Sequence, residues 1–281
     1  MTNNLPQFLL SAKILTAGIY LFGLAALVPL TNSVSSSLAF AEATNKTLAT
    51  DTSPITIEAA EFLEWNQNEG TYIAKGNAFV HQDESRIKAA HIIARYNTSG
   101  ETRNINHFIA TGNVTYIEGE NIAKGDKLDY DLTAGFYLLT GKDASVEGPR
   151  GKMTATESIT YDAAEDANRK VTATGKARYR TDDGRIVFGD TLIAYIAADG
   201  ALKTIDAIDN TKVISTNGTE ATADKLTYVA KTALANLDGN VEIIDNENIM
   251  RGDKARIDFD QEISRIISNP GGKRVSGTLT P

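Results

Sequence analysis

The sequence contains no cysteine, which excludes a disulfide framework and thiolate metal sites and leaves the redox compartment undetermined. It also lacks a run of basic residues, and 28 Lys and Arg stand against 36 Asp and Glu, for a formal net charge of -8. A surface this acidic argues against nucleic acid as a partner and against electrostatic docking on anionic lipid. No segment after residue 42 carries an apolar period of a helix, so the body is not expected to be helical.

The stretch 110–140 shows what the chain has instead. Its runs at 114–117 and 127–131 alternate apolar and polar residues, and a third run follows at 136–139. Apolar residues at every second position, separated by Gly, Asn and Asp, are typical of short antiparallel strands with one buried face. We therefore predict a body that is nearly all β, built from one hairpin-like module.

The module recurs at intervals of about 32 residues. Its first element ends in an aromatic residue, in AAEFLEW (Trp65), HIIARY (Tyr96), GDKLDY (Tyr130), TESITY (Tyr161), GDTLIAY (Tyr195), ADKLTY (Tyr228) and GDKARIDF (Phe259). No module buries its apolar face alone, whereas stacked neighbours bury it together. The repeat therefore predicts an elongated β structure of stacked antiparallel strands.

Glycines precede the second element of five modules, at Gly76, Gly112, Gly141, Gly175 and Gly239. Three of them are followed by an asparagine, at Asn77, Asn113 and Asn240. Glycine adopts positive φ without steric cost, and asparagine tolerates it better than most residues. A tight turn or a bulge is expected at each position.

Alternation also assigns one face of each strand to the interior. The predicted interior row mixes aliphatic residues with tyrosines and runs from one end of the body to the other. Its members are Leu63, Trp65, Val80, Val114, Tyr116, Leu128, Tyr130, Val146, Ile159, Tyr161, Tyr179, Ile193, Tyr195, Leu226, Tyr228, Val241, Ile243, Ile257 and Phe259. On the residues alone, this row fits either a closed, packed core or an apolar groove.

The N-terminus predicts export. Lys13 precedes an apolar run from Ile14 to Leu30, and Ala39-Phe40-Ala41 follows a Ser-rich stretch. This order matches a secretory signal peptide cleaved after Ala41, although the run is also close to the length of a membrane anchor. The prediction divides the chain into a signal peptide or anchor (1–41), a polar linker (42–53), the β body (54–268) and a flexible tail (269–281).

No catalytic or metal-binding constellation is found in the sequence. The histidines, His81, His91 and His107, are not spaced with Asp or Glu as metal ligands, and no serine lies in a G-x-S-x-G context. Repeated Gly-Asp pairs such as Gly125-Asp126 recur too far apart for a calcium-binding solenoid, which needs nine-residue repeats. We expect no enzyme activity, no cofactor and no metal.

Both ends of the body carry strands without a neighbour in sequence, at 55–58 and 263–268. Soluble proteins normally protect such edges. Pro54 precedes the first strand, and Asn269-Pro270-Gly271-Gly272 is expected to stop any strand after the last one. The edges are therefore candidate surfaces for pairing with another chain.

The motifs of the first half are the most informative. ITIEAAEFLEW opens the body, and GTYIAKGNAFV, KAAHIIARY and IATGNVTY with AKGDKLDYD follow in that order. In these residues the sequence resembles the OstA-like, or LptA-type, periplasmic lipopolysaccharide-transport family. The resemblance covers about residues 54–260 and is clear again at 221–259, in a chain longer than the usual member.

The resemblance implies a β-jellyroll folded like a taco shell around an apolar groove. It implies a periplasmic bridge that shields the acyl chains of lipopolysaccharide (the lipid A moiety) on the way from the inner-membrane transporter to the outer membrane. Partners would be jellyroll domains of inner- and outer-membrane transport components, or further copies of the chain joined head to tail. Two alternatives stay open: an inner-membrane-anchored LptC-like relay, and a structural β-solenoid with a filled core and no lipid.

Overall fold

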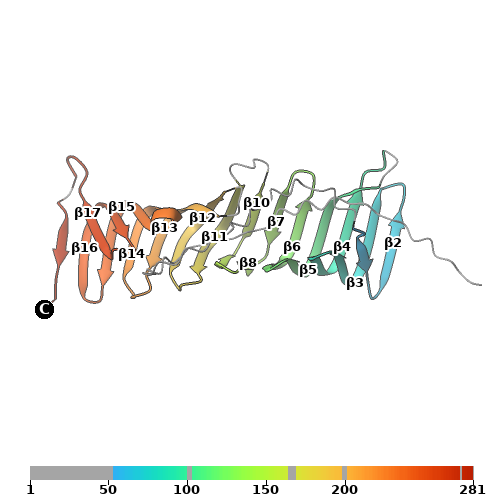
Figure 1. The fold of residues 1–281 in the computed structure, drawn as a ribbon, viewed down its shortest axis with the longest axis horizontal. Coiled ribbons are helices and arrows are strands. Elements are labelled where there is room, and N and C mark those ends of the chain that lie inside the picture. The colour runs from blue at the N-terminus through green and yellow to red at the C-terminus, as the bar shows by residue number, and fades with distance from the viewer. Residues whose placement is uncertain (1–52, 100–102, 164–168, 198–200, 273, 281) are drawn as a thin grey trace, which may run out of the picture.

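The protein is a single long antiparallel β-sheet in a computed structural model that describes residues 53–99, 103–163, 169–197, 201–272 and 274–280. The strands stack along the long axis, with β2 near one end and the C-terminus at the other (Figure 1). They are β1 (Thr56–Glu58), β2 (Phe62–Asn66), β3 (Thr71–Gln82), β4 (Ser85–Tyr96), β5 (Ile105–Glu118), β6 (Asn121–Asp131), β7 (Phe136–Thr140), β8 (Ala144–Gly148), β9 (Gly151–Ala155), β10 (Ser158–Asp162), β11 (Arg169–Thr181), β12 (Ile186–Ile196), β13 (Leu202–Ile214), β14 (Glu220–Val229), β15 (Leu234–Asp245), β16 (Asn248–Asp258), β17 (Ile263–Ile267) and β18 (Ser276–Thr278). One 3-10 helix, η1 (Ala230–Thr232), links β14 to β15. The all-β prediction is confirmed.

Each long strand, β3–β6 and β11–β16, is bent near its middle. In β5 the bend falls at Gly112 and Asn113, which adopt φ values of 82° and 50°, and the pairing register shifts between Thr111 and Val114. Two successive residues with positive φ mark the same point in β3, β11, β13 and β15. A bulge bends a strand and raises its local twist. The Gly-Asn positions are therefore bends inside single strands.

The bends divide the sheet into two walls. Wall A holds β2, β7, β10 and β17 with the half of every long strand that pairs alongside them. Wall B holds β1, β8, β9 and β18 with the other halves. The inner faces of the two walls meet, since Tyr116 of wall B lies 5.8 Å from Tyr130 of wall A between ring centroids. The strand ends opposite the bends form the free side of the fold, called here the seam.

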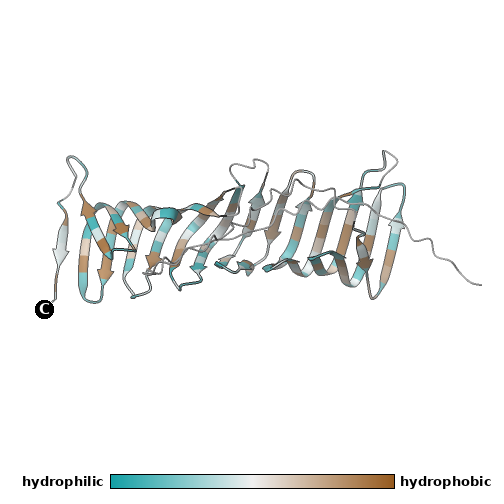
Figure 2. Ribbon diagram, viewed as in Figure 1, coloured by the Kyte–Doolittle hydropathy of each residue, from teal (hydrophilic) through white to brown (hydrophobic). Residues whose placement is uncertain are grey.

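One hydrophobic core lies between the walls and runs the length of the sheet. Apolar and polar residues alternate along the strands in Figure 2, as expected for a sheet with one buried face. Leu128, Ile159 and Leu192 are fully buried in wall A, and Ala78 and Val114 are 1 % exposed in wall B. The core is thus made of both inner faces, and neither wall could bury its apolar face alone.

The C-terminal segment differs from the predicted flexible tail. Ser276–Thr278 forms β18 and pairs antiparallel with Ile249–Arg251 of β16. Asn269 and Gly272 close a turn through a backbone hydrogen bond, and the Asn269 backbone N–H donates to Asp253 Oδ2 at 2.8 Å. The turn residues were recognised correctly, but they reverse the chain onto wall B and do not end the sheet.

The close packing at the bend of β5 gives a testable prediction for the substitution of Gly112 by alanine. A Cβ at Gly112 would lie 2.8 Å from the Cβ of Ala90, whereas a Cβ at Gly218, whose φ is 90°, would have no neighbour within 4 Å. Both Gly→Ala changes strain the backbone, by about 1–3 kcal/mol, but only Gly112→Ala adds a clash. We expect Gly112→Ala to lower the melting temperature clearly more than Gly218→Ala. Equal losses would contradict the close approach of β4 and β5 at the bend.

Candidate functional site

The interior between the walls contains most of the predicted groove residues. Fourteen of them are 0–7 % exposed: Val80, Val114, Tyr116, Leu128, Tyr130, Val146, Ile159, Tyr161, Tyr179, Leu226, Tyr228, Val241, Ile243 and Ile257. Trp65 and Phe259 are partly buried against the same core. The alternation of the sequence therefore identified the inner face correctly at these positions.

Two predicted residues, Ile193 and Tyr195, lie on the outer face of β12, and that part of the prediction is wrong. Their neighbours Leu192, Ala194 and Ile196 are the buried ones. The segment GDTLIAY is one residue longer between Gly-Asp and its aromatic than GDKLDY. Aligning on the aromatic residue therefore shifted the register by one, and a shift of one residue exchanges the faces of a strand.

Leu63 is on the inner face but is not covered. It pairs with the buried Ala74 in wall A and is 52 % exposed, because β2 is the last strand of this wall. The interior is thus open to solvent at the β2 end.

The prediction also missed several interior residues. Phe108 and Met153 are fully buried, and so is Leu192 on the shifted strand. Phe108 precedes Ala110 by two residues in β5, and Met153 pairs with Val146 across β8 and β9. The signal that could have found them is the same two-residue period, continued one step beyond the aromatic motif.

Tyrosines close the middle of the interior. Tyr116 of wall B contacts Tyr130 and Tyr137 of wall A, at 5.8 and 6.4 Å between ring centroids. Tyr137 and Tyr161, on neighbouring strands of wall A, stack at 5.1 Å. Burial raises the pKa of Tyr116, Tyr130 and Tyr137 well above the usual tyrosine value, so these hydroxyls stay neutral. In the middle of the body, the facing walls touch through side chains and leave these rings inaccessible to water.

Arg185 closes the seam nearer the C-terminus. It follows β11 in wall B, and its guanidinium lies 3.4 Å from the Tyr228 hydroxyl and 5.2 Å from the centre of the Phe259 ring, both in wall A. Asp183 holds the same guanidinium by an ion pair of 2.6 Å. Arg185 therefore bridges the walls while its charge stays paired.

Glu118 is a buried carboxyl group at the seam, beside the tyrosines. It is 6 % exposed, and its Oε1 has no hydrogen-bond partner among the described residues. Burial raises its pKa to about 7, and the neighbouring Tyr116 hydroxyl opposes this shift. Because the unfolded pKa is lower, near 4.5, the contribution to stability is fully present below that pH. It is lost as the pH rises toward 7, since only the unfolded state ionises in this window.

A glutamine at this position tests the assignment. Glu118→Gln removes an ionisation that costs about 3 kcal/mol of folding stability above neutral pH. We expect the variant to melt about 6–12 °C higher than the parent at pH 8 and at a similar temperature at pH 4.5. Glu120→Gln, exposed in the same turn, serves as the control and should show neither change. Equal behaviour of the two variants would refute the buried state of Glu118.

Several polar groups outside the interior have structural partners. His107 Nε2 lies 2.6 Å from Asp129 Oδ1 on the outer face, so this histidine does have an acidic neighbour across β5 and β6. At the bends, the side-chain amides of Asn210 and Asn240 donate hydrogen bonds to Asp190 and Asp224. These two aspartates of the repeated Gly-Asp and Ala-Asp pairs therefore have a structural role. Within the described ranges, no group of three or more His, Cys, Asp or Glu could hold a metal ion.

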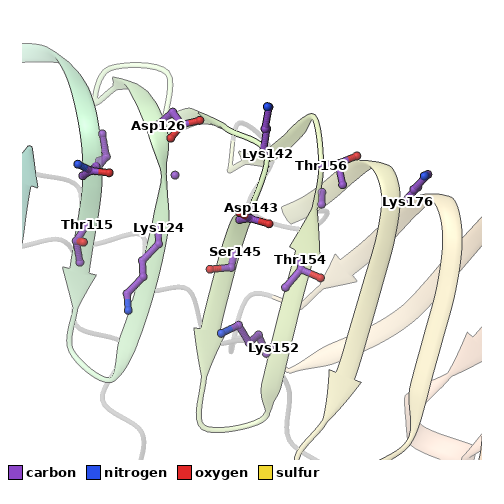
Figure 3. Close-up of a pocket in the computed structure, with 14 residues that line it drawn as sticks. Thr115, Lys124, Asp126, Lys142, Asp143, Ser145, Lys152, Thr154, Thr156 and Lys176 are labelled. Carbon is purple, nitrogen blue, oxygen red and sulfur yellow. The ribbon is translucent and has the colours of Figure 1, made fainter.

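A shallow hollow of about 750 Å³ lies on the outside of wall B. Thr115, Lys124, Ser145, Lys152 and Thr154 form its floor together with residues of the bends. Figure 3 shows the bend lysines, Lys142 and Lys176, pointing away from Ser145 and Thr154. Lys152 pairs with Glu147 at 3.0 Å. The four ammonium groups therefore do not converge on one position, and the interior remains the candidate site.

Comparison with known proteins agrees with this architecture. The family described as "LptA/(LptD N-terminal domain) LPS transport protein" matches twice, over residues 56–167 and 163–263. The chain belongs to this family. Membership confirms the resemblance seen in the sequence and the expectation of a transport protein that is not an enzyme. No curated protein matches the chain in sequence.

Among solved structures, the chain is similar to LptH of Pseudomonas aeruginosa, titled the LptA homologous periplasmic component of the conserved lipopolysaccharide transport device. The two are 13 % identical over 82 % of this chain and 98 % of LptH, with a TM-score of 0.23. The fold described above rests on strand pairing and does not depend on this likeness.

The predicted signal peptide or anchor and most of the linker lie outside the described residues. In the part of the chain that is described, no helix has the length and apolar character needed to cross a membrane.

Proposed function

We propose that the protein is a periplasmic bridge that carries lipopolysaccharide with its acyl chains between the two walls and its sugars in water. The observation that supports this most directly is the continuous apolar interior of a chain that belongs to a lipopolysaccharide-transport family. Transferring hydrocarbon from water is worth about 0.8 kcal/mol per CH₂, so a lipid with several acyl chains requires an extended apolar surface. The inner faces of the walls supply one along the whole body.

Lipid entry requires the walls to part at the seam, because the interior residues are covered in the closed form. Among the described residues, every strand register joins residues of the same wall, and none crosses the seam. The walls meet there through side chains such as Tyr116 with Tyr137 and Arg185 with Tyr228. Opening therefore breaks side-chain packing but keeps the hydrogen bonds of the sheet. Acyl chains would replace the packing that is lost.

Such a carrier holds and passes on lipid but has no means of extracting it from a bilayer. The energy must come from a partner, which the resemblance seen in the sequence implies is an inner-membrane transporter. The free strands at the two ends suit pairing with jellyroll domains of inner- and outer-membrane components, since an added strand completes the hydrogen bonds of an exposed edge. A chain with this role acts outside the inner membrane, as the predicted export signal requires.

Photo-crosslinking tests where the lipid lies. A photoreactive residue at Leu128 or Leu226, both buried in wall A, should form adducts with lipopolysaccharide in cells. The matched positions Lys127 and Lys225 are adjacent, exposed and on the outer face, and should not. Adducts only from the two lysine positions would exclude the interior as the lipid site.

A filled scaffold without lipid is the second candidate, and the burial of most interior residues favours it. The two functions differ in whether the walls must move. A short bismaleimide joining Arg185→Cys to Tyr228→Cys, in a chain without other cysteines, holds the seam shut. We expect this crosslink to reduce lipopolysaccharide binding at least about tenfold, a loss of about 1.4 kcal/mol.

The two single-cysteine variants, treated with the same reagent, control for the loss of Arg185 or Tyr228. If the crosslinked protein binds lipid as well as they do, the walls need not part, and the proposed entry route is wrong. If none of the proteins, including the parent, retains lipid after purification or binds it when added, the scaffold is the better description.

A further inference from the structure

The outer face of wall B is basic, although the net charge of the chain is -8. Between the bends and the seam, the strands from β4 to β11 carry exposed cations on this face and one exposed carboxylate, Glu147. The cations are Arg86, Lys88, Lys124, Lys152, Arg178 and Arg180. The outer face of wall A is balanced over the same part of the sheet, with Arg95, Lys127 and Lys170 against Asp129, Asp131 and Asp162. Positive charge is therefore concentrated on one face of one wall.

One register row on this face combines three cations with three hydroxyl groups. The residues that lie opposite one another on successive strands of wall B are Lys88, Thr115, Lys124, Ser145, Thr154 and Arg178, called here the polar row. Neighbouring strands are about 4.8 Å apart, so the polar row is about 24 Å long. It follows the long axis along which the strands stack (Figure 1).

The side chains of the polar row are not used by the fold. Within the described ranges, none of the six forms an ion pair or a hydrogen bond, whereas Lys152 beside them pairs with Glu147 at 3.0 Å. Lys88 Nζ lies 5.4 Å from the centre of the Phe79 ring, and Arg178 Cζ lies 5.6 Å from that of Phe188. A cation above an aromatic ring is held in place but keeps N–H donors for an anion. The row is thus both available and partly ordered in advance.

The middle of the polar row is the floor of the hollow on wall B. Figure 3 shows Thr115, Lys124, Ser145 and Thr154 on the strands that line it. Because the hollow is shallow and its ammonium groups do not converge, it does not suit one compact anion. An extended ligand with several negative charges would instead meet the cations one after another, and its own polar groups would reach the hydroxyls between them.

Acidic turns border the polar row on the side of the seam. Asp83 and Glu84 lie between β3 and β4, Glu120 lies between β5 and β6, and Asp182 follows β11, all exposed. A flat anionic membrane would meet these carboxylates together with the cations and would be repelled by them. The same turns separate the polar row from the seam, where the sugars of a lipid held between the walls would emerge. The border therefore favours a narrow ligand that is not the lipid cargo.

We propose that the polar row binds a linear anionic glycan, the glycan strand of the cell wall, along the outer face of wall B. Carboxylates of this polymer would pair with Lys88, Lys124 and Arg178, and its sugars would exchange hydrogen bonds with the hydroxyls of the row. The inference takes the periplasmic location from the proposed function and otherwise goes beyond it. The lipid interior lies on the opposite face of the same strands, so both ligands bind at once, and the cell wall holds the bridge in place.

Co-sedimentation with purified cell-wall sacculi at low ionic strength tests the surface. The protein should pellet with the sacculi, and the combined variant Lys88→Gln, Lys124→Gln and Arg178→Gln should bind at least about tenfold more weakly, because three charge-assisted contacts are lost. The variant Arg95→Gln, Lys127→Gln and Lys170→Gln removes the same charge from wall A and should stay within about twofold of the parent. No binding by the parent, or equal losses in the two variants, would overturn the proposal.

The hydroxyl groups distinguish a glycan from any other polyanion. Thr154→Val keeps the shape of the side chain but removes its hydroxyl, and should weaken binding to sacculi at least about threefold. Its binding to inorganic polyphosphate, which meets only the cations, should not change. Thr172→Val, on the outer face of wall A, is the matched control and should alter neither. Unchanged binding of Thr154→Val to sacculi would contradict a glycan ligand.

Two further probes separate the sources of negative charge. The polysaccharide released from lipopolysaccharide by mild acid and vesicles of phosphatidylglycerol should each bind at least about tenfold more weakly than sacculi. Stronger binding to either probe than to sacculi would overturn the assignment to the cell wall.

Lipid adducts from a photoreactive residue at position 128 separate this inference from the carrier function. If adducts form while sacculi never bind, only the glycan surface is wrong. If sacculi bind with the expected dependence on the polar row while adducts are absent, the carrier function fails and the glycan surface stands.

Discussion

The fold depends on one backbone constraint, the pair of left-handed residues at the middle of alternate long strands. At Gly112-Asn113 and Gly239-Asn240, these residues form a bulge that turns the strand without ending it. Each such strand therefore belongs to both walls, and its hydrogen bonds to its neighbours continue on both sides of the bend. A flat sheet of this length would expose one apolar face along its whole surface, and the bends remove that exposure by folding the face onto itself.

The same constraint shows how the proposed carrier would open. The walls are joined covalently at the bends but meet at the seam through side chains, including the Tyr116 contacts and the Arg185 bridge. The seam is thus the weak side of the structure. Glu118 is buried at the seam, and burial raises its pKa to about 7, so its ionisation above this pH disfavours the closed form that the proposal requires to open. In the proposed carrier, movement at the seam would leave the hydrogen bonds of the sheet intact.

Much of the architecture could be predicted from the sequence because a two-residue period of apolar residues shows which side chains of each strand face the interior. The period placed Leu128, Tyr130 and Ile159 in the interior, and the glycines marked the bends. The prediction failed at Ile193 and Tyr195 because β12 was aligned with the other modules on its aromatic residue. Alignment on the Gly-Asp pair gives the correct faces. Whether the interior is closed could not be predicted, because closure depends on side-chain contacts between the two walls. The apolar pattern of a single strand contains no information about these contacts. β18 was missed because the turn before it, Asn269–Gly272, normally ends a strand.

The central claim is that the walls part to admit lipid, and the distance across the seam measures this most directly. Spin labels at Glu120→Cys in wall B and Thr133→Cys in wall A occupy exposed turns on the two sides of the seam. Pulsed electron paramagnetic resonance gives the distance between them with and without lipopolysaccharide. We expect the distance to increase when lipopolysaccharide is bound and to return when it is removed. An unchanged distance in protein that demonstrably holds lipid would contradict the account.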